Sequence, residues 1–175
     1  AGATGRLGTL ICDIIEEDPS LELVARVTSS SAPDAGADAE LLVDVSHPDA
    51  SPAIVERALD RGQRVLVGTS GWSEARLEAL RERLATLPDA AVIVVPNFSL
   101  GSVLGTVLAR VAAPFFDSIE VVEAHHPQKV DSPSGTAVRT AELIAAARNG
   151  RPVEAPFADQ TARGELVAGI PVHSL

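Results

Sequence analysis

The chain has 175 residues and 46% of them are apolar, which is enough to bury the core of one domain or two small ones and argues against disorder. Its formal net charge of −10 argues against a surface that binds nucleic acid or an anionic membrane, but leaves open a local basic site for a small anion. The single cysteine, Cys12, permits no internal disulfide and fits a reducing compartment, so we expect a cytoplasmic protein.

The first half of the chain alternates between helical and strand-like patterns. Apolar residues from Leu7 to Ile15 recur at helical spacing, whereas those over residues 21–27 alternate as in a strand. A continuous apolar run over residues 91–95 is typical of a strand buried on both faces. The expected helices span residues 5–17, 51–62 and 73–87, and the expected strands span residues 21–27, 40–45, 64–67 and 91–95. This order predicts a parallel, doubly wound sheet.

The pattern changes after Pro96, and we place a domain boundary between residues 97 and 98. The second half is expected to contain helices over residues 100–113 and 134–148, a strand over residues 118–124 and an edge strand near residues 167–172. The sequence therefore predicts an α/β chain, in which a parallel-sheet domain over residues 1–97 precedes an α+β domain over residues 98–175.

Three turns rich in small residues adjoin the expected strands of the first domain. Gly2 to Gly8 reads G-x-x-G-x-x-G before the first helix, a pattern that suits a dinucleotide pyrophosphate but also occurs in ordinary tight turns. Residues 68–71 (GTSG) and 95–98 (VPNF) follow the ends of two strands. Because ligands of open α/β sheets lie at the carboxyl edge of the strands, the three turns together predict a nucleotide crevice.

The residues after the second expected strand favour NADPH over NADH. An acidic residue that would bind the ribose 2′-hydroxyl of NADH is missing there, and Thr28 to Ser31 stand in its place. Arg26, or Arg6 in the glycine turn, could face a 2′-phosphate instead.

Lys129 is the only lysine of the chain, and it closely follows His125 and His126. The histidines could simply lie in a solvated loop, which is the usual fate of an isolated histidine. A metal site is a second interpretation, but no cysteine or carboxylate at helical spacing completes the ligands. The third is acid–base chemistry on an anionic substrate, with a lysine that pairs with a carboxylate. Asp131 and the expected helix start at Ser134 support the third interpretation.

Four segments of the chain resemble the dihydrodipicolinate reductase family of lysine and diaminopimelate biosynthesis. They read GATGRLG, VGTSGW, VPNFSLG and, most specifically, EAHHPQKVDSPSGTA. The resemblance implies a Rossmann-type nucleotide-binding domain over residues 1–97 and a substrate-binding and oligomerisation domain over residues 98–175. It also implies a homotetramer and a small heterocyclic dicarboxylate as substrate. The net charge predicts no nucleic-acid or membrane partner. The expected reaction is NAD(P)H-dependent reduction of 4-hydroxy-tetrahydrodipicolinate to tetrahydrodipicolinate.

The resemblance also implies roles for individual residues. His125 would be the general acid, with Lys129 as its partner. The substrate carboxylates would be bound by His126, Lys129, Gly135 and Thr136. The dinucleotide would be bound by Gly2, Ala3, Thr4, Gly5, Arg6, Leu7, Gly68, Thr69, Ser70, Val95, Pro96, Asn97 and Phe98.

The chain departs from the family pattern in three respects. Gln128 stands where the family usually has a basic residue. No strand precedes Ala1, and family members continue for several strands and a helix after the position of Leu175. We therefore expect a chain truncated at both ends, whose first domain lacks its first strand and whose second domain is incomplete.

Two alternatives stay open at this stage. One is a truncated relative that binds nucleotide without turnover. The other is a different two-domain NAD(P)-dependent reductase, such as a semialdehyde or homoserine dehydrogenase, but Cys12 is badly placed for the catalytic cysteine of such enzymes. His47 is expected to lie in a turn, and His173 is expected to have a structural role. Trp72 either covers the crevice or anchors the next helix.

Overall fold

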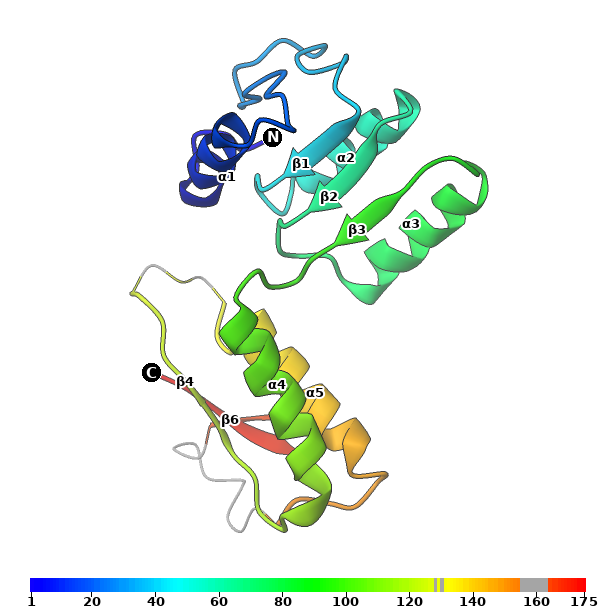
Figure 1. Cartoon of the computed structure of the whole chain (residues 1–175). Helices are drawn as coiled ribbons and strands as arrows, with labels where there is room; N and C mark the ends of the chain where they lie inside the picture. The colour runs from blue at the N-terminus through cyan, green and yellow to red at the C-terminus, as the bar shows by residue number, and fades with distance from the viewer. Residues whose placement is uncertain (128, 130, 155–163) are drawn as a thin grey trace. The chain divides into compact units, whose positions relative to one another are not determined.

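The computed structural model describes residues 1–127, 129, 131–154 and 164–175. The chain forms two compact units, unit 1 over Ala1–Pro96 and unit 2 over Asn97–Leu175, so the division falls one residue before the expected boundary. Figure 1 shows the elements of each unit. Among the helices of the described residues, none is long and apolar enough to cross a membrane.

Unit 1 contains a parallel sheet of three strands in the order β1-β2-β3 (Figure 1). Asp44 of β1 lies beside Val67 of β2, and Val67 lies beside Val94 of β3, so the strands end in register at one edge. The main core cluster combines residues of α2, β2 and α3, among them Val55, Val67 and Leu80. The elements are α1 (Arg6–Glu17), β1 (Leu41–Asp44), α2 (Ser51–Asp60), β2 (Arg64–Val67), α3 (Glu74–Ala85) and β3 (Val92–Val94).

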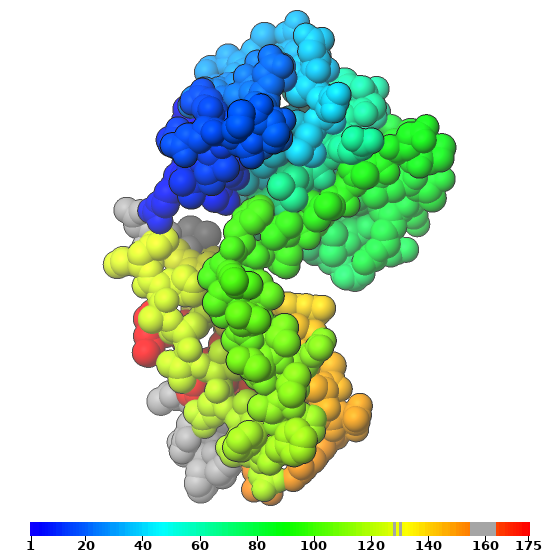
Figure 2. All heavy atoms as spheres, viewed as in Figure 1, coloured from blue at the N-terminus to red at the C-terminus, as the bar shows by residue number. Residues whose placement is uncertain are grey.

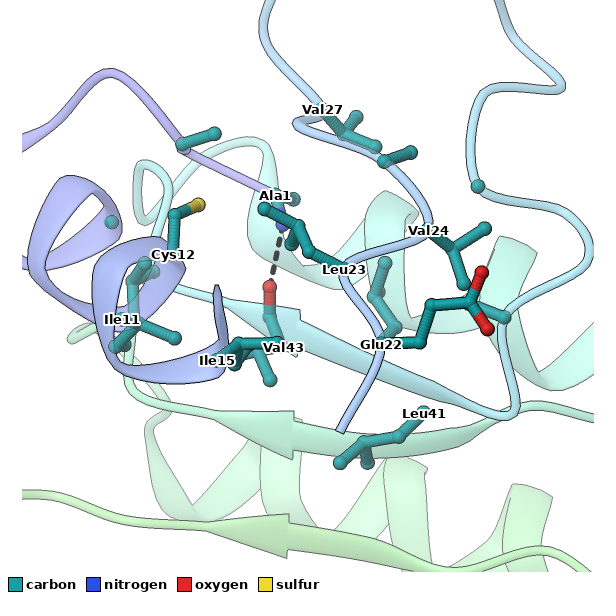
Figure 3. A pocket seen from close by; sticks show the side chains of 17 residues that line it. Ala1, Ile11, Cys12, Ile15, Glu22, Leu23, Val24, Val27, Leu41 and Val43 are labelled. Carbon is teal, nitrogen blue, oxygen red and sulfur yellow. Dashed lines mark hydrogen bonds between the residues drawn. The ribbon is translucent and has the colours of Figure 1, made fainter. Parts of the chain in front are cut away.

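The strand expected over residues 21–27 is wrong, because this segment has irregular backbone. The segment lies beside the N-terminal residues, because Ala3 N donates to Val27 O at 3.2 Å. Ala1 O in turn accepts a hydrogen bond from Val45 N, just after β1, at 3.1 Å. A strand needs a ladder of such bonds, and among the described residues the segment has only the bond from Ala3 to Val27 with residues 1–3. Figure 3 shows the apolar side chains between α1, this segment and β1, where a gap of about 100 Å³ remains in the packing.

Unit 2 has a mixed sheet in the order β4-β6-β5, in which β4 is parallel and β5 antiparallel to β6. The expected edge strand near residues 167–172 is instead a hairpin, because Ala168 and Gly169 both adopt positive φ in its two-residue turn. β6 therefore lies in the middle of the sheet. The elements are α4 (Leu100–Ala112), the 3₁₀ helix η1 (Ala113–Phe115), β4 (Val121–Glu123), α5 (Gly135–Ala147), β5 (Glu165–Val167) and β6 (Ile170–Ser174).

Helices α4 and α5 lie against each other, and a hydrogen bond of 2.8 Å joins Thr106 to Thr140. The core of unit 2 is formed by α5 and β6, with Ala141, Ile144 and Ile170 almost inaccessible to solvent. No residue of α4 is buried, and Leu108 remains 65% exposed. Figure 2 shows α4 in green on the viewed face of unit 2.

Arg148, at the C-terminal end of α5, is 4% exposed and ties this end of unit 2 together. A buried guanidinium must be hydrogen-bonded, because an unpaired charge in the interior is strongly unfavourable. Here the partners are carbonyl oxygens at the C-cap of α4 and in the segments that follow η1 and α5. Arg148 donates to the carbonyls of Ala113 (2.9 Å), Phe116, Asp117 (3.4 Å), Arg151 (3.1 Å) and Pro152 (2.6 Å).

We expect Arg148→Met to lower the free energy of unfolding of unit 2 by about 2–4 kcal/mol, because buried carbonyls lose their donor. Arg148→Lys should recover only part of this loss, since an ammonium does not reproduce the planar fork. Urea unfolding followed by far-UV circular dichroism measures both. Arg139→Met on the exposed surface of α5 is the control and should change stability by less than about 0.5 kcal/mol. An equally small effect at Arg148 would contradict the assignment.

Candidate functional site

The glycine turn before α1 is packed so tightly that two of its glycines have no room for a side chain. A Cβ on Gly2 would lie 2.5 Å from the carbonyl oxygen of Val45, and Gly2 has a φ of +80°. A Cβ on Gly8 would lie 2.0 Å from the carbonyl oxygen of Gly2. Gly5 is the N-cap of α1 and provides no side-chain hydrogen bond to the first N–H groups. The helix N-terminus therefore keeps donors and partial positive charge for an anion.

A fully buried aspartate fixes the turns at the carboxyl edge of the sheet. Asp44 is the last residue of β1, and its carboxylate accepts hydrogen bonds from Ser51 Oγ and from Ser46 Oγ at 2.5 Å. Trp72 Nε1 donates to Ser51 Oγ at 3.0 Å, so the indole anchors this network. Ser46 N donates to Thr69 Oγ1 at 2.9 Å, which links the turn after β1 to the turn after β2.

A cavity of about 450 Å³ opens beside the glycine turn, which is within the usual range for small-molecule sites. Of the dinucleotide residues predicted from sequence, Gly2, Thr4 and Gly5 line it. The hydroxyl-bearing segment after residue 27 also lines it, together with His47, Arg57 of α2 and Arg61 at the C-cap of α2. The others predicted lie outside this lining: Ala3, Arg6, Leu7, Gly68, Thr69, Ser70, Val95 and Pro96 in unit 1, and Asn97 and Phe98 in unit 2.

The arginines differ from the sequence-based expectation. Arg26 pairs with Glu16 at 2.7 Å, so its guanidinium already has an anionic partner. Arg57 and Arg61 were not singled out from the sequence, although a one-turn repeat of arginine on an expected helix was a visible signal. Asn97, expected to contact dinucleotide, accepts a hydrogen bond from Ser99 N and donates to Ser102 Oγ, both at 2.8 Å, and so helps to start α4.

In unit 2, the histidine–lysine segment joins β4 to α5. His125 Nδ1 lies 3.6 Å from Glu123 Oε2, and the His125 side chain is 39% exposed. His126 and Thr136 are exposed, and the His126 carbonyl oxygen accepts from Lys129 N at 3.1 Å. Gln128 lies outside the described residues. No three His, Cys, Asp or Glu side chains gather as metal ligands would in the part of the chain that the structure describes.

Lys129 is connected to the N-terminus of α5 through one carboxylate. Lys129 Nζ donates to Asp131 Oδ1 at 2.6 Å, and Gly135 N donates to Asp131 Oδ2 at 3.2 Å. The hydrogen bond from Lys129 is the main cause of a lowered pKa of the Asp131 carboxyl. The ammonium and the first helical N–H thus lie close enough for a single carboxylate to bridge them.

Glu123 holds the opposite side of this helix start. Ser134, the N-cap of α5, donates to Glu123 through its backbone N at 2.7 Å and through its hydroxyl. Burial would raise the pKa of the Glu123 carboxyl, but hydrogen bonds from Ser134 and Ser174 and the nearby His125 outweigh it, so the pKa is lowered. From the sequence, Glu123 was recognised only as part of the EAHHPQK motif, without a role of its own.

The two remaining histidines have local partners. His173, in β6, lies 3.0 Å from Glu120 Oε2, and His47 lies 3.6 Å from Asp49 Oδ2 in an exposed turn. Both positions agree with the structural and turn roles expected from the sequence, although His47 also lines the cavity.

Two family models match the chain. Residues 1–98 match the N-terminal model of dihydrodipicolinate reductase, and residues 101–175 match its C-terminal model. The chain is 53% identical to the 4-hydroxy-tetrahydrodipicolinate reductase of Clavibacter michiganensis subsp. michiganensis, covering 99% of this chain and 63% of that relative. It is 43% identical to that of Mycobacterium marinum, covering 99% of this chain and 73% of that relative.

A solved structure is also similar, the dipicolinate-bound dihydrodipicolinate reductase from Paenisporosarcina sp. TG-14. It has a TM-score of 0.73 and 28% sequence identity, over 99% of this chain and 76% of that chain. The two-domain α/β fold class expected from the sequence is confirmed.

The lowered pKa of Glu123 predicts how acid affects stability. Since the folded pKa lies below the ordinary value of 4.5, the contribution of Glu123 to the free energy of unfolding is complete above about pH 4.5 and is lost as the pH falls below it. We expect Glu123→Gln to be less stable than the wild type near neutral pH, and the difference to shrink toward acid pH. Urea unfolding at about pH 7 and about pH 3.5 measures this.

Glu142→Gln, in an exposed ion pair on α5, serves as the control and should have little effect at either pH. A stability difference between Glu123→Gln and wild type that does not vary with pH would contradict the prediction.

Proposed function

The chain belongs to the dihydrodipicolinate reductase family, and we propose on this basis that the protein reduces 4-hydroxy-tetrahydrodipicolinate to tetrahydrodipicolinate with NAD(P)H. The chain spans 63% of the length of the Clavibacter relatives that it resembles at 53% identity. The observation that carries the proposal is the single carboxylate that bridges Lys129 Nζ and Gly135 N. A substrate carboxylate has the same shape and charge as the Asp131 group that now joins these donors.

In this proposal unit 1 binds the dinucleotide. The glycine turn and the uncapped N-terminus of α1 suit a pyrophosphate, and the adjoining cavity has room for a nucleoside. Asp44 holds the turns after β1 and β2 in place through its hydrogen-bond network. A bound reduced nicotinamide supplies the hydride.

Unit 2 binds the substrate in this proposal. Lys129 and Gly135 bind one carboxylate by taking it up in place of Asp131, and His126 and Thr136 complete the contacts to the dicarboxylate. His125 is the proton donor. The conversion replaces the 4-hydroxyl by hydrogen, and the hydroxyl leaves as water; hydride addition gives the ring carbanion or enamine character, and protonation by an adjacent imidazolium lowers that barrier. The partial exposure of His125 leaves its ring accessible to a ligand.

We also propose a homo-oligomer, a tetramer by family resemblance. The exposed apolar side chains of α4 support association, because contiguous apolar surface is unfavourable in water. The cytoplasmic location inferred from the single cysteine stays a prediction.

His125→Ala and Lys129→Ala should each lower kcat by roughly 10²–10⁴, because each removes a group that acts on the developing charge. Lys129→Arg should not restore full activity, since a planar guanidinium does not replace a compact ammonium. Steady-state assays of NADPH oxidation in the presence of substrate give kcat and KM. Quenching of Trp72 fluorescence by NADPH, measured in parallel, should be unaffected by these unit 2 substitutions. Wild-type turnover in either alanine variant would remove that residue from the mechanism, and NADPH binding without any wild-type turnover would favour a nucleotide-binding protein.

We further propose that NADPH is preferred, with Arg57 and Arg61 binding the 2′-phosphate at the hydroxyl-lined end of the cavity. Arg57→Ala and Arg61→Ala should each weaken NADPH binding about 10-fold and change NADH binding little, because only NADPH carries the extra charge. Arg26→Ala is the matched control, since Arg26 already pairs with Glu16 and should leave the ratio of the two affinities unchanged. A wild-type preference for NADH, or a larger effect of Arg26→Ala, would overturn the proposal.

A further inference from the structure

The carboxylate of Glu123 joins three segments of unit 2. Glu123 is the last residue of β4, and its side chain is 10% exposed. It accepts hydrogen bonds from the backbone and hydroxyl of Ser134 at the start of α5, and from Ser174 Oγ of β6 at 2.8 Å. On its remaining side it faces the ring of His125 at 3.6 Å.

The backbone explains why this glutamate and this histidine meet. Leu175 N donates to the carbonyl oxygen of Glu123 at 2.9 Å, and His125 N donates to the carbonyl oxygen of Leu175 at 3.4 Å. These bonds continue the ladder of β4 and β6 past the end of β4. Residues two apart on an extended chain lie on the same face, so the side chains of Glu123 and His125 are held on one side.

The energetics keep Glu123 ionised. A buried carboxylate is unfavourable unless its oxygens are hydrogen-bonded, and here the hydroxyls and the backbone N–H supply those bonds. The result is a fixed negative charge beside one ring nitrogen of His125. Because the carboxylate lies beside Nδ1, Nε2 is the ring nitrogen that Glu123 does not engage.

The charged groups on the adjoining elements are engaged with one another. Lys129 and Asp131 of the same loop pair at 2.6 Å, and His173 of β6 pairs with Glu120 at 3.0 Å. His126 follows His125 in the loop. Glu123 is therefore the carboxylate that faces His125 from β4.

We propose that Glu123 is a positioning residue, which orients the His125 ring for proton donation through Nε2. This inference rests on the function proposed above, in which His125 is the proton donor. In this role Glu123 acts through His125.

Glu123→Gln tests the proposal, because it keeps the size of the side chain and removes its charge. We expect kcat to fall by roughly 10–100-fold, with KM for substrate and NADPH affinity within about 3-fold of wild type. Glu123→Asp, which keeps the charge, should recover part of the lost kcat. Glu120→Gln, which removes the carboxylate beside His173, is the matched control and should leave kcat near the wild-type value.

A second measurement separates this inference from the proposed function. In a histidine-labelled chain, NMR at neutral pH should show different chemical shifts of the His125 ring nitrogens in Glu123→Gln and wild type, and unchanged shifts in Glu120→Gln. This outcome supports the positioning role even where the wild type shows no turnover, which would overturn the proposed function alone. His125 ring signals that are identical in wild type and Glu123→Gln overturn the inference. So does a loss of kcat that Glu123→Asp does not recover in part.

Discussion

In each unit, a carboxylate at the last residue of a strand bonds to the serine that begins a helix. Asp44 of β1 accepts from Ser51, the first residue of α2, and Glu123 of β4 accepts from Ser134, the N-cap of α5. A strand end and a helix start are the places where backbone groups lack regular partners. A carboxylate offers several acceptor positions on one rigid group, so it can fix both the turn and the helix direction. The proposed ligand-binding segments adjoin these two anchors.

Much of the fold follows from local patterns. Three local signals indicate helices: the helical period before residue 17, the proline in the first turn of α2 and the serine before α3. The observed bounds of these helices agree closely with the expected ones. Strands depend more on neighbours. Residues 21–27 carry an alternating pattern without forming a ladder, because only Ala3 bonds to the segment among residues 1–3. The hairpin of β5 and β6 was missed because alanine at position 168 is an unusual residue for positive φ.

The candidate site was less accessible from sequence, and for a different reason. A motif reveals residues that are close along the chain, such as His125 and Lys129, whereas partners brought together by folding leave no local signal. Glu123 meets Ser174 across 51 positions. Similarly, Arg26 is paired with Glu16 ten positions earlier, a contact that depends on how α1 packs beside the following segment. Burial is likewise a property of the folded chain, and it distinguishes Asp44 from the exposed carboxylates around it.

The charge of the protein constrains how an anion can bind. With a formal net charge of −10 and one lysine, the chain does not attract a dicarboxylate through its overall field. Lys129 already pairs with Asp131, so a substrate carboxylate exchanges one ion pair for another, and the net Coulomb gain is small. Affinity in the proposed site must then come from contacts that Asp131 does not already make, namely those to the second carboxylate and to the ring of the ligand. A monocarboxylate could displace Asp131 but would gain nothing further, so this exchange favours ligands with two carboxylates over ligands with one.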